Sequence, residues 1–250
     1  MDGYTKRRAD GPPGFFEVEA AGLRWLAVPG GVPVAPVLTV NAGSITIGRV
    51  TTTPATAAAA AMFGARLAAT HDAGASAFGT GPDGWSGDGY IGDAPLTLRA
   101  HETWGAFYAA ERVLPYARTA ARTGALSRAG LATIEALAER LASGEFDDGA
   151  PPARIHGDLW AGNVLFSGDS VTLIDPAAHG GHRITDLAML TLFGLPHLAE
   201  VFAAYSDASA QLPPGWRDLV GLHQLHPLLV HAVLFGGGYG ESAVSTARRY

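Results

Sequence analysis

The sequence contains no cysteine among its 250 residues, so neither a disulfide nor a thiolate zinc site can form. It also has no run of about 18 apolar residues, the length that indicates a membrane-spanning helix. Its first residues, MDGYTKRRAD, are polar and include no apolar stretch of the kind found in secretory signal peptides. From these absences we expect a cytoplasmic protein that does not contact a membrane.

Charged residues are also scarce. Asp, Glu, Lys and Arg make up 16% of the chain, and 17 basic against 23 acidic residues give a formal net charge of −6. Proteins whose main partner is nucleic acid usually carry an excess of basic residues, so we do not expect such a partner. Hydrophobic residues, in contrast, make up 48% of the chain, which is enough for the core of one large domain or of two lobes.

The strongest local pattern is a β-hairpin flanked by acids. Residues 164–166 (VLF) and 171–174 (VTLI) are β-prone, and the Ser-Gly-Asp-Ser between them is typical of a tight hairpin turn. Asp158 lies ahead of the hairpin, and Asn163 lies five positions after Asp158. Asp175 comes directly after the second strand. The pattern predicts a polar loop, a hairpin and an acid at its end.

This spacing is typical of kinases. In their catalytic loop an Asp accepts the proton of the substrate hydroxyl and an Asn five residues later binds metal, while a further Asp binds the Mg²⁺ that bridges the phosphates. We therefore predict Asp158 as the catalytic base, and Asn163 and Asp175 as ligands of Mg²⁺ in an ATP-dependent reaction. The alternative is that all three only cap backbone groups, but two spacings and a hairpin together favour the kinase interpretation.

The wider sequence resembles the fructosamine and ketosamine 3-kinases, which belong to the aminoglycoside-phosphotransferase-like kinases. The likeness rests on HGDLWAGN at 156–163, IDPA at 174–177, GHR at 181–183 and DLAM at 186–189. Weaker matches at 16–26, 90–92, 104–108 and 225–239 extend it, in order, over nearly the whole chain. HGDxxxxN alone indicates only a small-molecule kinase, whereas the Leu-Trp pair and the flanking motifs favour the ketosamine branch.

The resemblance implies an α+β, protein-kinase-like fold of two lobes. A reduced N-terminal β lobe at residues 1–50 would contain a strand with Lys6, a helix with Glu19 and two further strands, and a mainly helical catalytic lobe would span residues 51–250. Lys6 and Glu19 would pair and steady the phosphates of ATP. The family has two strands and a phosphate-covering loop before this lysine, whereas only five residues precede Lys6. A wrongly chosen start codon, a natural truncation and loss of activity would each explain the difference.

By the same resemblance, the protein would transfer the γ-phosphate of ATP to the 3-hydroxyl of a ketosamine such as a fructosamine or a ribulosamine. Trp160, His182 and Arg183 are candidate substrate contacts, although His182 and Arg183 could equally brace their loop. His156 and Asp186 are expected to support the catalytic loop, with Asp186 also capping the helix that it begins. Neither the particular ketosamine nor the oligomeric state follows from the sequence.

Periodicity and turn residues predict the remaining elements. We expect helices at 15–27, at the alanine-rich residues 55–70, after Ser127 and within 216–235, strands at 34–40 and 44–50, and a flexible turn at 179–183. The tail at 242–250 should be either an exposed helix or frayed. ATP's adenine would lie near residues 47–50. We interpret His71 as structural, and residues 90–92 as a weak candidate for the substrate side.

Three alternative functions deserve comparison. A pseudokinase that binds nucleotide or sugar without catalysis would explain the missing strands, but it would have no need of all three predicted catalytic and metal-binding residues. A kinase for another hydroxyl compound, such as an aminoglycoside, stays open. A zinc hydrolase could use the pairs His179/His182 and His223/His226, but they lie in segments of different type, the sequence has no HExxH, and zinc would leave Asn163 without a role.

Overall fold

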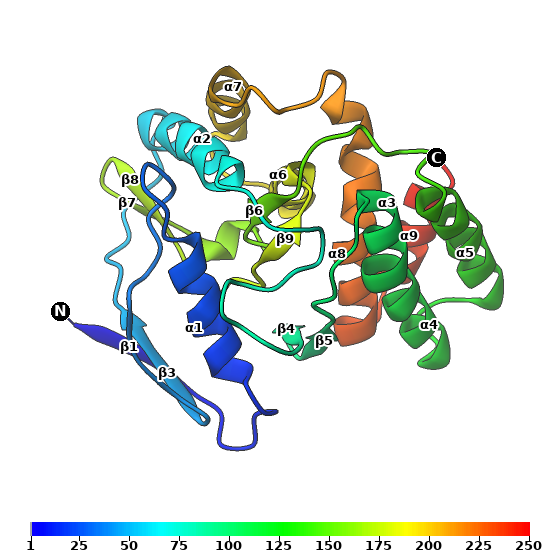
Figure 1. The fold of residues 1–250 in the computed structure, drawn as a ribbon, viewed down its shortest axis with the longest axis horizontal. Coiled ribbons are helices and arrows are strands. Elements are labelled where there is room, and N and C mark those ends of the chain that lie inside the picture. Colours follow the sequence, from blue (N-terminus) through cyan, green and yellow to red (C-terminus); the bar gives the residue numbers. More distant parts are fainter. Residues whose placement is uncertain (1) are drawn as a thin grey trace.

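The N-terminal part of the computed structural model, which describes residues 2–250, is a small sheet covered by one helix. Strands β1 (Gly3–Arg7), β2 (Val37–Asn41) and β3 (Ser44–Gly48) form an antiparallel sheet in the order β1-β3-β2. Successive side chains of a strand point to opposite faces, and the isoleucines of β3 pack with the apolar face of α1 (Phe15–Leu26). The helix and the two strands predicted here are confirmed, and both strands are shorter than expected (Figure 1).

The rest of the chain is mainly helical (Figure 1). Its helices are α2 (Ala57–Asp72), α3 (Trp104–Phe107), α4 (Leu114–Arg122), α5 (Arg128–Ala142), α6 (Arg183–Phe193), α7 (Leu198–Ala208), α8 (Val220–Phe235) and α9 (Tyr239–Ala247). A π-helical turn at Tyr108–Val113 joins α3 to α4, and short 3₁₀ turns lie at Ala161–Asn163 and Trp216–Leu219. Three two-stranded ladders complete the fold: β4 (Gly89–Ile91) with β5 (Ala94–Leu96), β6 (Ala153–Ile155) with β9 (His179–Gly181), and β7 (Val164–Ser167) with β8 (Ser170–Leu173).

Two hydrophobic cores hold these helices. One joins α3, α4, α5, α8 and α9, and the other joins α2, α6 and α7 to the β7–β8 hairpin. Helix α2 approaches α7 so closely that a Cβ on Gly64 would lie 2.1 Å from the carbonyl oxygen of Val201. Small side chains are what permit this approach, which explains the alanine-rich composition of α2 as close helix packing.

Two of the predictions about flexible segments are wrong. Residues His179–Gly181 form strand β9, which pairs antiparallel with β6 and is fully buried, so the segment is not a mobile turn. The C-terminal tail is helical, as one of the two expectations had it, but α9 is not an exposed helix, because Ala243, Val244 and Ala247 belong to the core with α5 and α8. In both cases distant partners bury the segment, and local composition does not show such partners.

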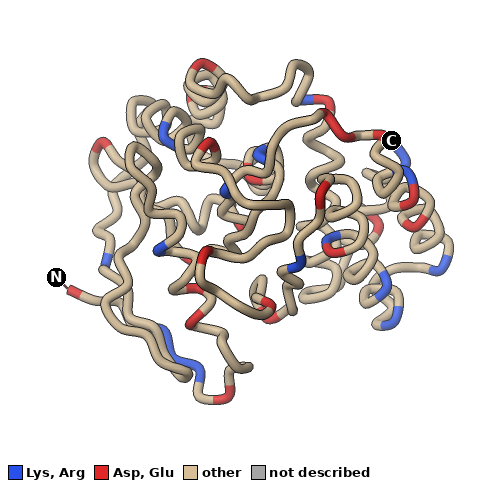
Figure 2. Tube along the Cα trace, viewed as in Figure 1, with Lys and Arg blue, Asp and Glu red and all other residues tan. Residues whose placement is uncertain are grey.

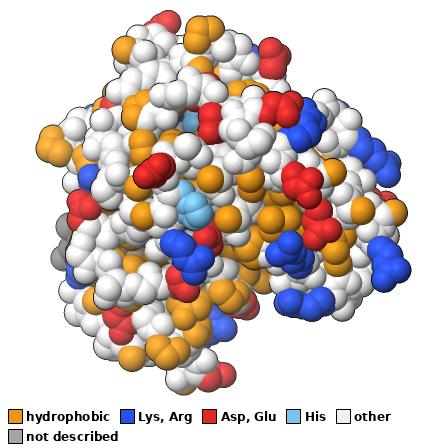
Figure 3. All heavy atoms as spheres, turned by 45° about the vertical axis from the view of Figure 1, so that its right-hand side comes forward, with side chains coloured by type: hydrophobic (Ala, Val, Ile, Leu, Met, Phe, Trp, Pro, Cys, Tyr) orange, Lys and Arg blue, Asp and Glu red, His pale blue; other side chains and the backbone are white. Residues whose placement is uncertain are grey.

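The surface carries charges of both signs. Figure 2 shows acidic and basic residues near the sheet at the lower left as well as among the helices at the right. On the face drawn in Figure 3, hydrophobic side chains gather near the middle and charged side chains flank them. No helix within residues 2–250 is both long and apolar enough to cross a membrane.

Candidate active site

The loop between β6 and β7 carries the first group of predicted residues. It turns sharply at Gly157, whose φ of 81° lies in the left-handed region that favours glycine. A Cβ at this position would lie 2.2 Å from the carbonyl oxygen of Ala177, so the turn has no room for a residue with a side chain in place of Gly157. The turn sets the direction in which Asp158 leaves the end of β6.

A buried carboxylate holds this loop from below. Asp186, which is fully buried, accepts hydrogen bonds from the backbone N–H of His156 at 2.7 Å and of Gly157 at 3.0 Å, and His71 Nε2 lies 3.1 Å from it. Burial alone would raise the pKa of Asp186, but the hydrogen bond with His71 and the donors of the loop outweigh it and lower the pKa. The hydrogen bonds expected between Asp186 and the catalytic loop are therefore present.

Helix α6 is capped by a different residue than expected. It begins at Arg183, and the backbone N–H of Ile184 donates to His182 Nδ1 at 3.2 Å. Asp186 lies one turn inside the helix, where its carboxylate faces the loop and not the helix end. The prediction that Asp186 caps the helix is wrong, because the helix starts three residues earlier.

His156 links the loop to the end of the hairpin. Its Nε2 donates to the carbonyl oxygen of Ile174 at 2.9 Å, while its Nδ1 accepts from the backbone N–H of Asp158 at 3.2 Å. The ring thus connects the residue just before Asp175 with Asp158 itself. Such contacts fit the supporting role predicted for His156.

Asp158 and Asn163 lie together in the loop. Asn163 Nδ2 donates to the backbone oxygen of Asp158 at 2.8 Å and to its carboxylate at 3.3 Å. Burial raises the pKa of Asp158, and the nearby His156, His231 and Asn163 oppose this shift only in part. A carboxylate with a raised pKa is a stronger proton acceptor than an ordinary Asp.

Three charged groups from distant parts of the chain meet beside Asp158. Lys6 Nζ on β1 lies 2.5 Å from Glu19 Oε1 on α1 and 2.8 Å from Asp175 Oδ1 after β8. Burial by itself lowers the pKa of Lys6, but the two carboxylates outweigh it and raise the pKa, which keeps the ammonium charged. The Lys–Glu pair predicted from the sequence is present, with Asp175 as its third member.

Asp175 has an unusual backbone. Its φ is 54°, and only one other residue besides glycine, His197, has a positive φ among residues 2–250. A non-glycine residue in this region carries a cost of about 1 kcal/mol or more, and such strain gathers at functional sites. In this conformation the Asp175 carboxylate contacts Lys6.

These residues line three adjoining cavities. The sheet-side cavity, about 280 Å³, is lined by Tyr4, Lys6, Ile47, Gly48, Arg49, Val50, Leu165, Ile174 and Asp175. The central cavity, about 360 Å³, is lined by residues that include Lys6, Glu19, Tyr90, Ile91, Gly92, Asp158, Trp160, Asn163 and Asp175. The helix-side cavity, about 300 Å³, is lined by Ile91, Gly92, Asp158, Trp160, Met189, Phe193, Pro227, Val230, His231, Leu234 and Phe235.

The cavities share walls in a fixed order. Lys6 and Asp175 line both the sheet-side and the central cavity. Asp158 and Trp160 line both the central and the helix-side cavity. The candidate residues therefore line the walls that neighbouring cavities share, and we refer to the three adjoining cavities together as the channel.

The three predicted substrate contacts have different outcomes. Trp160 is 42% exposed and lines two of the cavities. His182 and Arg183 line none of the three and are buried, because the pairing of β9 with β6 turns them inward at the start of α6. His182 bonds to Asp148, and Arg183 bonds to Asp72, Ser209 and Gln211. Their predicted substrate role is wrong, and the alternative of bracing the fold describes them.

The far wall of the helix-side cavity could not be recognised in the sequence. Phe193 ends α6, while His231, Leu234 and Phe235 lie in the last turns of α8. They come from two helices and form no motif with Asp158. Of the substrate-side candidates, only the weak one at residues 90–92 and Trp160 pointed to this region, which the β4–β5 hairpin borders.

Asn163 and Asp175 fit a magnesium ion. Both line the central cavity, and among residues 2–250 neither Asn163 Oδ1 nor Asp175 Oδ2 has a hydrogen-bond donor. Mg²⁺ prefers oxygen ligands and is commonly held by one or two carboxylates together with substrate phosphates and water. Within the described part of the chain, no three side chains from His, Cys, Asp and Glu gather as a metal site, and this includes the histidine pairs considered for zinc.

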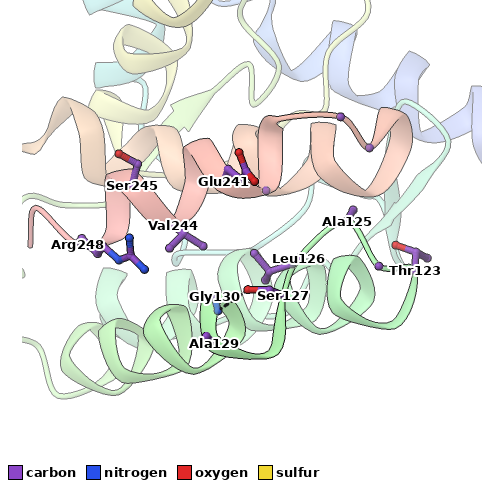
Figure 4. A pocket seen from close by; sticks show the side chains of 14 residues that line it. Thr123, Ala125, Leu126, Ser127, Ala129, Gly130, Glu241, Val244, Ser245 and Arg248 are labelled. Carbon is purple, nitrogen blue, oxygen red and sulfur yellow. Dashed lines mark hydrogen bonds between the residues drawn. The ribbon is translucent and has the colours of Figure 1, made fainter.

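A cavity more spacious than these three lies elsewhere. A cleft of about 790 Å³ runs between the α4–α5 connection and α9, and Figure 4 shows its mostly small lining side chains. Glu241 and Arg248 are its only charged residues. None of the predicted site residues lines it, so size alone does not identify the active site in this protein.

Comparison with known proteins gives a consistent family. A family model described as fructosamine kinase matches residues 5–250. A Thermus thermophilus protein named "Probable ketoamine kinase" is 32% identical over 241 residues, which cover 94% of this chain and 82% of that protein. A Synechocystis protein with the same kind of name is 36% identical over 183 residues, which cover 72% of this chain. That match spans only 58% of the Synechocystis protein.

Solved structures show the same fold. A Thermobifida fusca protein described as a "putative fructosamine-3-kinase" has a TM-score of 0.91 and 47% identity, over 98% of this chain and 84% of that one. A mutant aminoglycoside phosphotransferase has a TM-score of 0.58 at 18% identity, which concerns the fold alone. The predicted α+β, kinase-like fold with a mainly helical C-terminal part is confirmed.

Proposed function

The chain belongs to the fructosamine kinase family, and from this premise we propose that it is an ATP-dependent kinase that phosphorylates a hydroxyl of a ketosamine. One observation carries the proposal. The three adjoining cavities share Lys6 and Asp175 at one boundary and Asp158 at the other. This order suits a nucleotide, its transferring phosphate and an acceptor that lie end to end.

The sheet-side cavity suits the adenosine end of ATP. Residues 47–50, where we expected adenine from the sequence, line it together with the apolar Leu165 and Ile174. An adenine ring can pack between these apolar walls while backbone groups of the 47–50 segment bond its edge. Lys6 and Asp175 lie at the inner end of this cavity, where the phosphates would follow.

The central cavity suits the phosphates and their metal ion. Lys6 supplies a positive charge that Glu19 orients, and Asn163 and Asp175 would hold Mg²⁺. When bound, Mg²⁺ neutralises the charge of the phosphate oxygens. Most of the catalytic work in phosphoryl transfer is such positioning and charge neutralisation.

Asp158 suits the role of the base. It would accept the proton of the acceptor hydroxyl as that oxygen forms a bond to the γ-phosphorus, while the bond from the γ-phosphorus to the β–γ bridging oxygen breaks and ADP leaves. The raised pKa of Asp158 supports proton acceptance, and the hydrogen bond from Asn163 orients its carboxylate. By resemblance to the family, the hydroxyl is the one at carbon 3 of the ketosamine.

Intact site geometry argues against a pseudokinase. Lys6, Glu19 and Asp175 are in contact, and Asp158 and Asn163 are in contact, although they come from four separate parts of the chain. A chain without catalysis has no reason to keep both groups at the two boundaries of one channel. We also propose that the chain has two lobes divided near residue 50. The two groups of site residues support this division, because they lie where the small sheet meets the helical part.

The proposal is tested with ATP, Mg²⁺ and a panel of fructosamines and ribulosamines, with product mass as readout and aminoglycosides as comparison acceptors. We expect a mass gain of one phosphate on a ketosamine, and fragmentation of the product that assigns it to carbon 3. Asp158→Asn serves as the blank. Phosphorylation of an aminoglycoside alone, or of no acceptor by folded protein, would contradict the proposal.

A further inference from the structure

We propose that the helix-side cavity selects ketosamines whose amine nitrogen carries an apolar or aromatic substituent, and that Phe193 and Phe235 set this preference. The inference rests on the proposed function and deepens it by naming a substrate class. It concerns the far wall of the cavity, away from the residues assigned to the chemistry.

The walls of the helix-side cavity are mainly apolar. Among residues 2–250, Asp158 is the only acidic residue that lines it, and no Lys or Arg does. Apart from Asp158, His231 and the indole N–H of Trp160, every lining side chain is apolar. Ligand pockets of this kind bind apolar groups through their walls and fix orientation through a few polar groups. The polar end of the acceptor therefore belongs at Asp158 and its apolar end further along the wall.

Exposed aromatic side chains gather at the helix-side cavity. Six large hydrophobic side chains are exposed among residues 2–250, and three of them, Trp160, Phe193 and Phe235, line this one cavity. Phe235 is the most exposed of the six, at 68%. Exposed apolar side chains that gather at one place mark a binding surface more often than scattered ones do.

The rings of these side chains and of His231 form a row. Ring centroids are 6.3 Å apart between Trp160 and Phe193, 4.9 Å between Phe193 and His231, and 5.4 Å between His231 and Phe235. His231 Nδ1 lies 2.7 Å from the carbonyl oxygen of Pro227, which holds the middle ring in place. The row leads from the catalytic loop to the end of α8, so it lies along the path of a substituent whose sugar hydroxyl meets Asp158.

The same row accounts for the amine itself. A ketosamine nitrogen is a secondary amine that is protonated at neutral pH, and an ammonium group binds favourably over aromatic rings. A second charge further out on the substituent, as in lysine, has no acidic partner among the residues that line the cavity. Moving that charge out of water would cost binding energy, whereas an apolar group gains from burial.

The test compares ketosamines of one sugar with benzylamine, isoamylamine and lysine. We expect kcat/KM to be about tenfold higher for the benzyl and isoamyl compounds than for the lysine compound, mainly through KM. Phe235→Ala should reduce this ratio about fivefold, and because Phe235 is exposed the variant should fold normally. Leu38→Ala removes a side chain of 41% exposure on β2, outside all three cavities, and should leave the ratio unchanged.

The inference and the proposed function can fail separately. Calorimetry without ATP measures the affinity of the same compounds, so it tests the preference even in the absence of turnover. Tighter binding of the benzyl compound that Phe235→Ala weakens would support the preference. Equal kcat/KM and equal affinity for all three compounds, or the same ratio in Phe235→Ala as in the unmodified protein, would overturn it. Phosphorylation of all ketosamines at equal rates would leave the proposed function standing and remove only this inference.

Discussion

Asp158 in the channel wall and Asp186 in the network beneath it are two carboxylates with opposite environments. Asp186 has three hydrogen-bond partners, and its pKa is lowered although it is fully buried. Asp158 has a single side-chain donor, Asn163, and its pKa is raised by burial. This fold therefore gives full hydrogen bonding to the carboxylate that holds the loop, and few hydrogen bonds to the one proposed to act on substrate.

The largest expected effect is on turnover at the channel wall. Asp158→Asn should lower kcat about 10³-fold, which is typical of the loss of a general base. Phosphorylated ketosamine measured by mass spectrometry checks this, with nucleotide affinity as evidence that the site is intact. A near-normal kcat in Asp158→Asn would show that Asp158 has no chemical role.

The same variant should be more stable than the unmodified protein. Because its pKa is raised, Asp158 binds its proton more strongly in the folded than in the unfolded chain, so ionisation above about pH 4 lowers the free energy of unfolding. Asn removes this cost, and thermal unfolding at pH 7 should show a higher midpoint. A lower midpoint would mean that the carboxylate supports the fold, as Asp186 does.

The next effect is on stability in the network. Asp186→Asn should lower the free energy of unfolding by about 3 kcal/mol, because the buried N–H donors of the loop lose acceptors. Asp169→Asn, in the exposed turn of the β7–β8 hairpin, is the matched control and should change stability by less than about 0.5 kcal/mol. Urea unfolding measures both, and equal stability of the two variants would contradict the role given to Asp186.

Acid should destabilise the protein through its buried histidines. Burial lowers the pKa of His226 to about 3, so below the ordinary histidine pKa of about 6.5 only the unfolded chain takes up this proton. The protein should lose about 1.4 kcal/mol of stability per pH unit from this one residue between those values. His226→Asn should reduce the slope. An unchanged slope in His226→Asn would contradict the account.

The smallest expected effect concerns the nucleotide boundary. Lys6→Met should raise the KM for ATP about tenfold, because the phosphates lose a charge that Glu19 and Asp175 hold in place. Arg7→Met changes the next residue of β1, whose side chain points to the opposite face, and serves as control. If both variants raise the KM equally, general charge and not the position of Lys6 sets ATP affinity.

The catalytic loop and the hairpin could be predicted because their chemistry lies in one short segment. Asp158, Asn163 and Asp175 are separated by fixed spacings, and the turn between the strands has a recognisable composition. The pairing of Lys6 with Glu19 followed only from the resemblance, since a lysine near Arg7 and Arg8 is by itself an ordinary surface charge.

What could not be predicted depends on segments far apart in sequence. His182 and Arg183 look like polar loop residues until β6 pairs with β9 and buries them. The aromatic wall at Phe193 and Phe235 comes from two helices that meet only in the folded protein. Local patterns identified the residues proposed for catalysis, whereas the surface proposed to choose the substrate required the structure.

The role of Asp158 is tested most directly by following radiolabelled γ-phosphate from ATP into a ketosamine, with the unmodified protein and Asp158→Asn compared at equal nucleotide saturation. We expect labelled ketosamine from the unmodified protein and about 10³-fold less from the variant, with ATP affinity unchanged within about twofold. Equal labelling by both proteins, or no labelling by a folded protein that binds ATP, would contradict it.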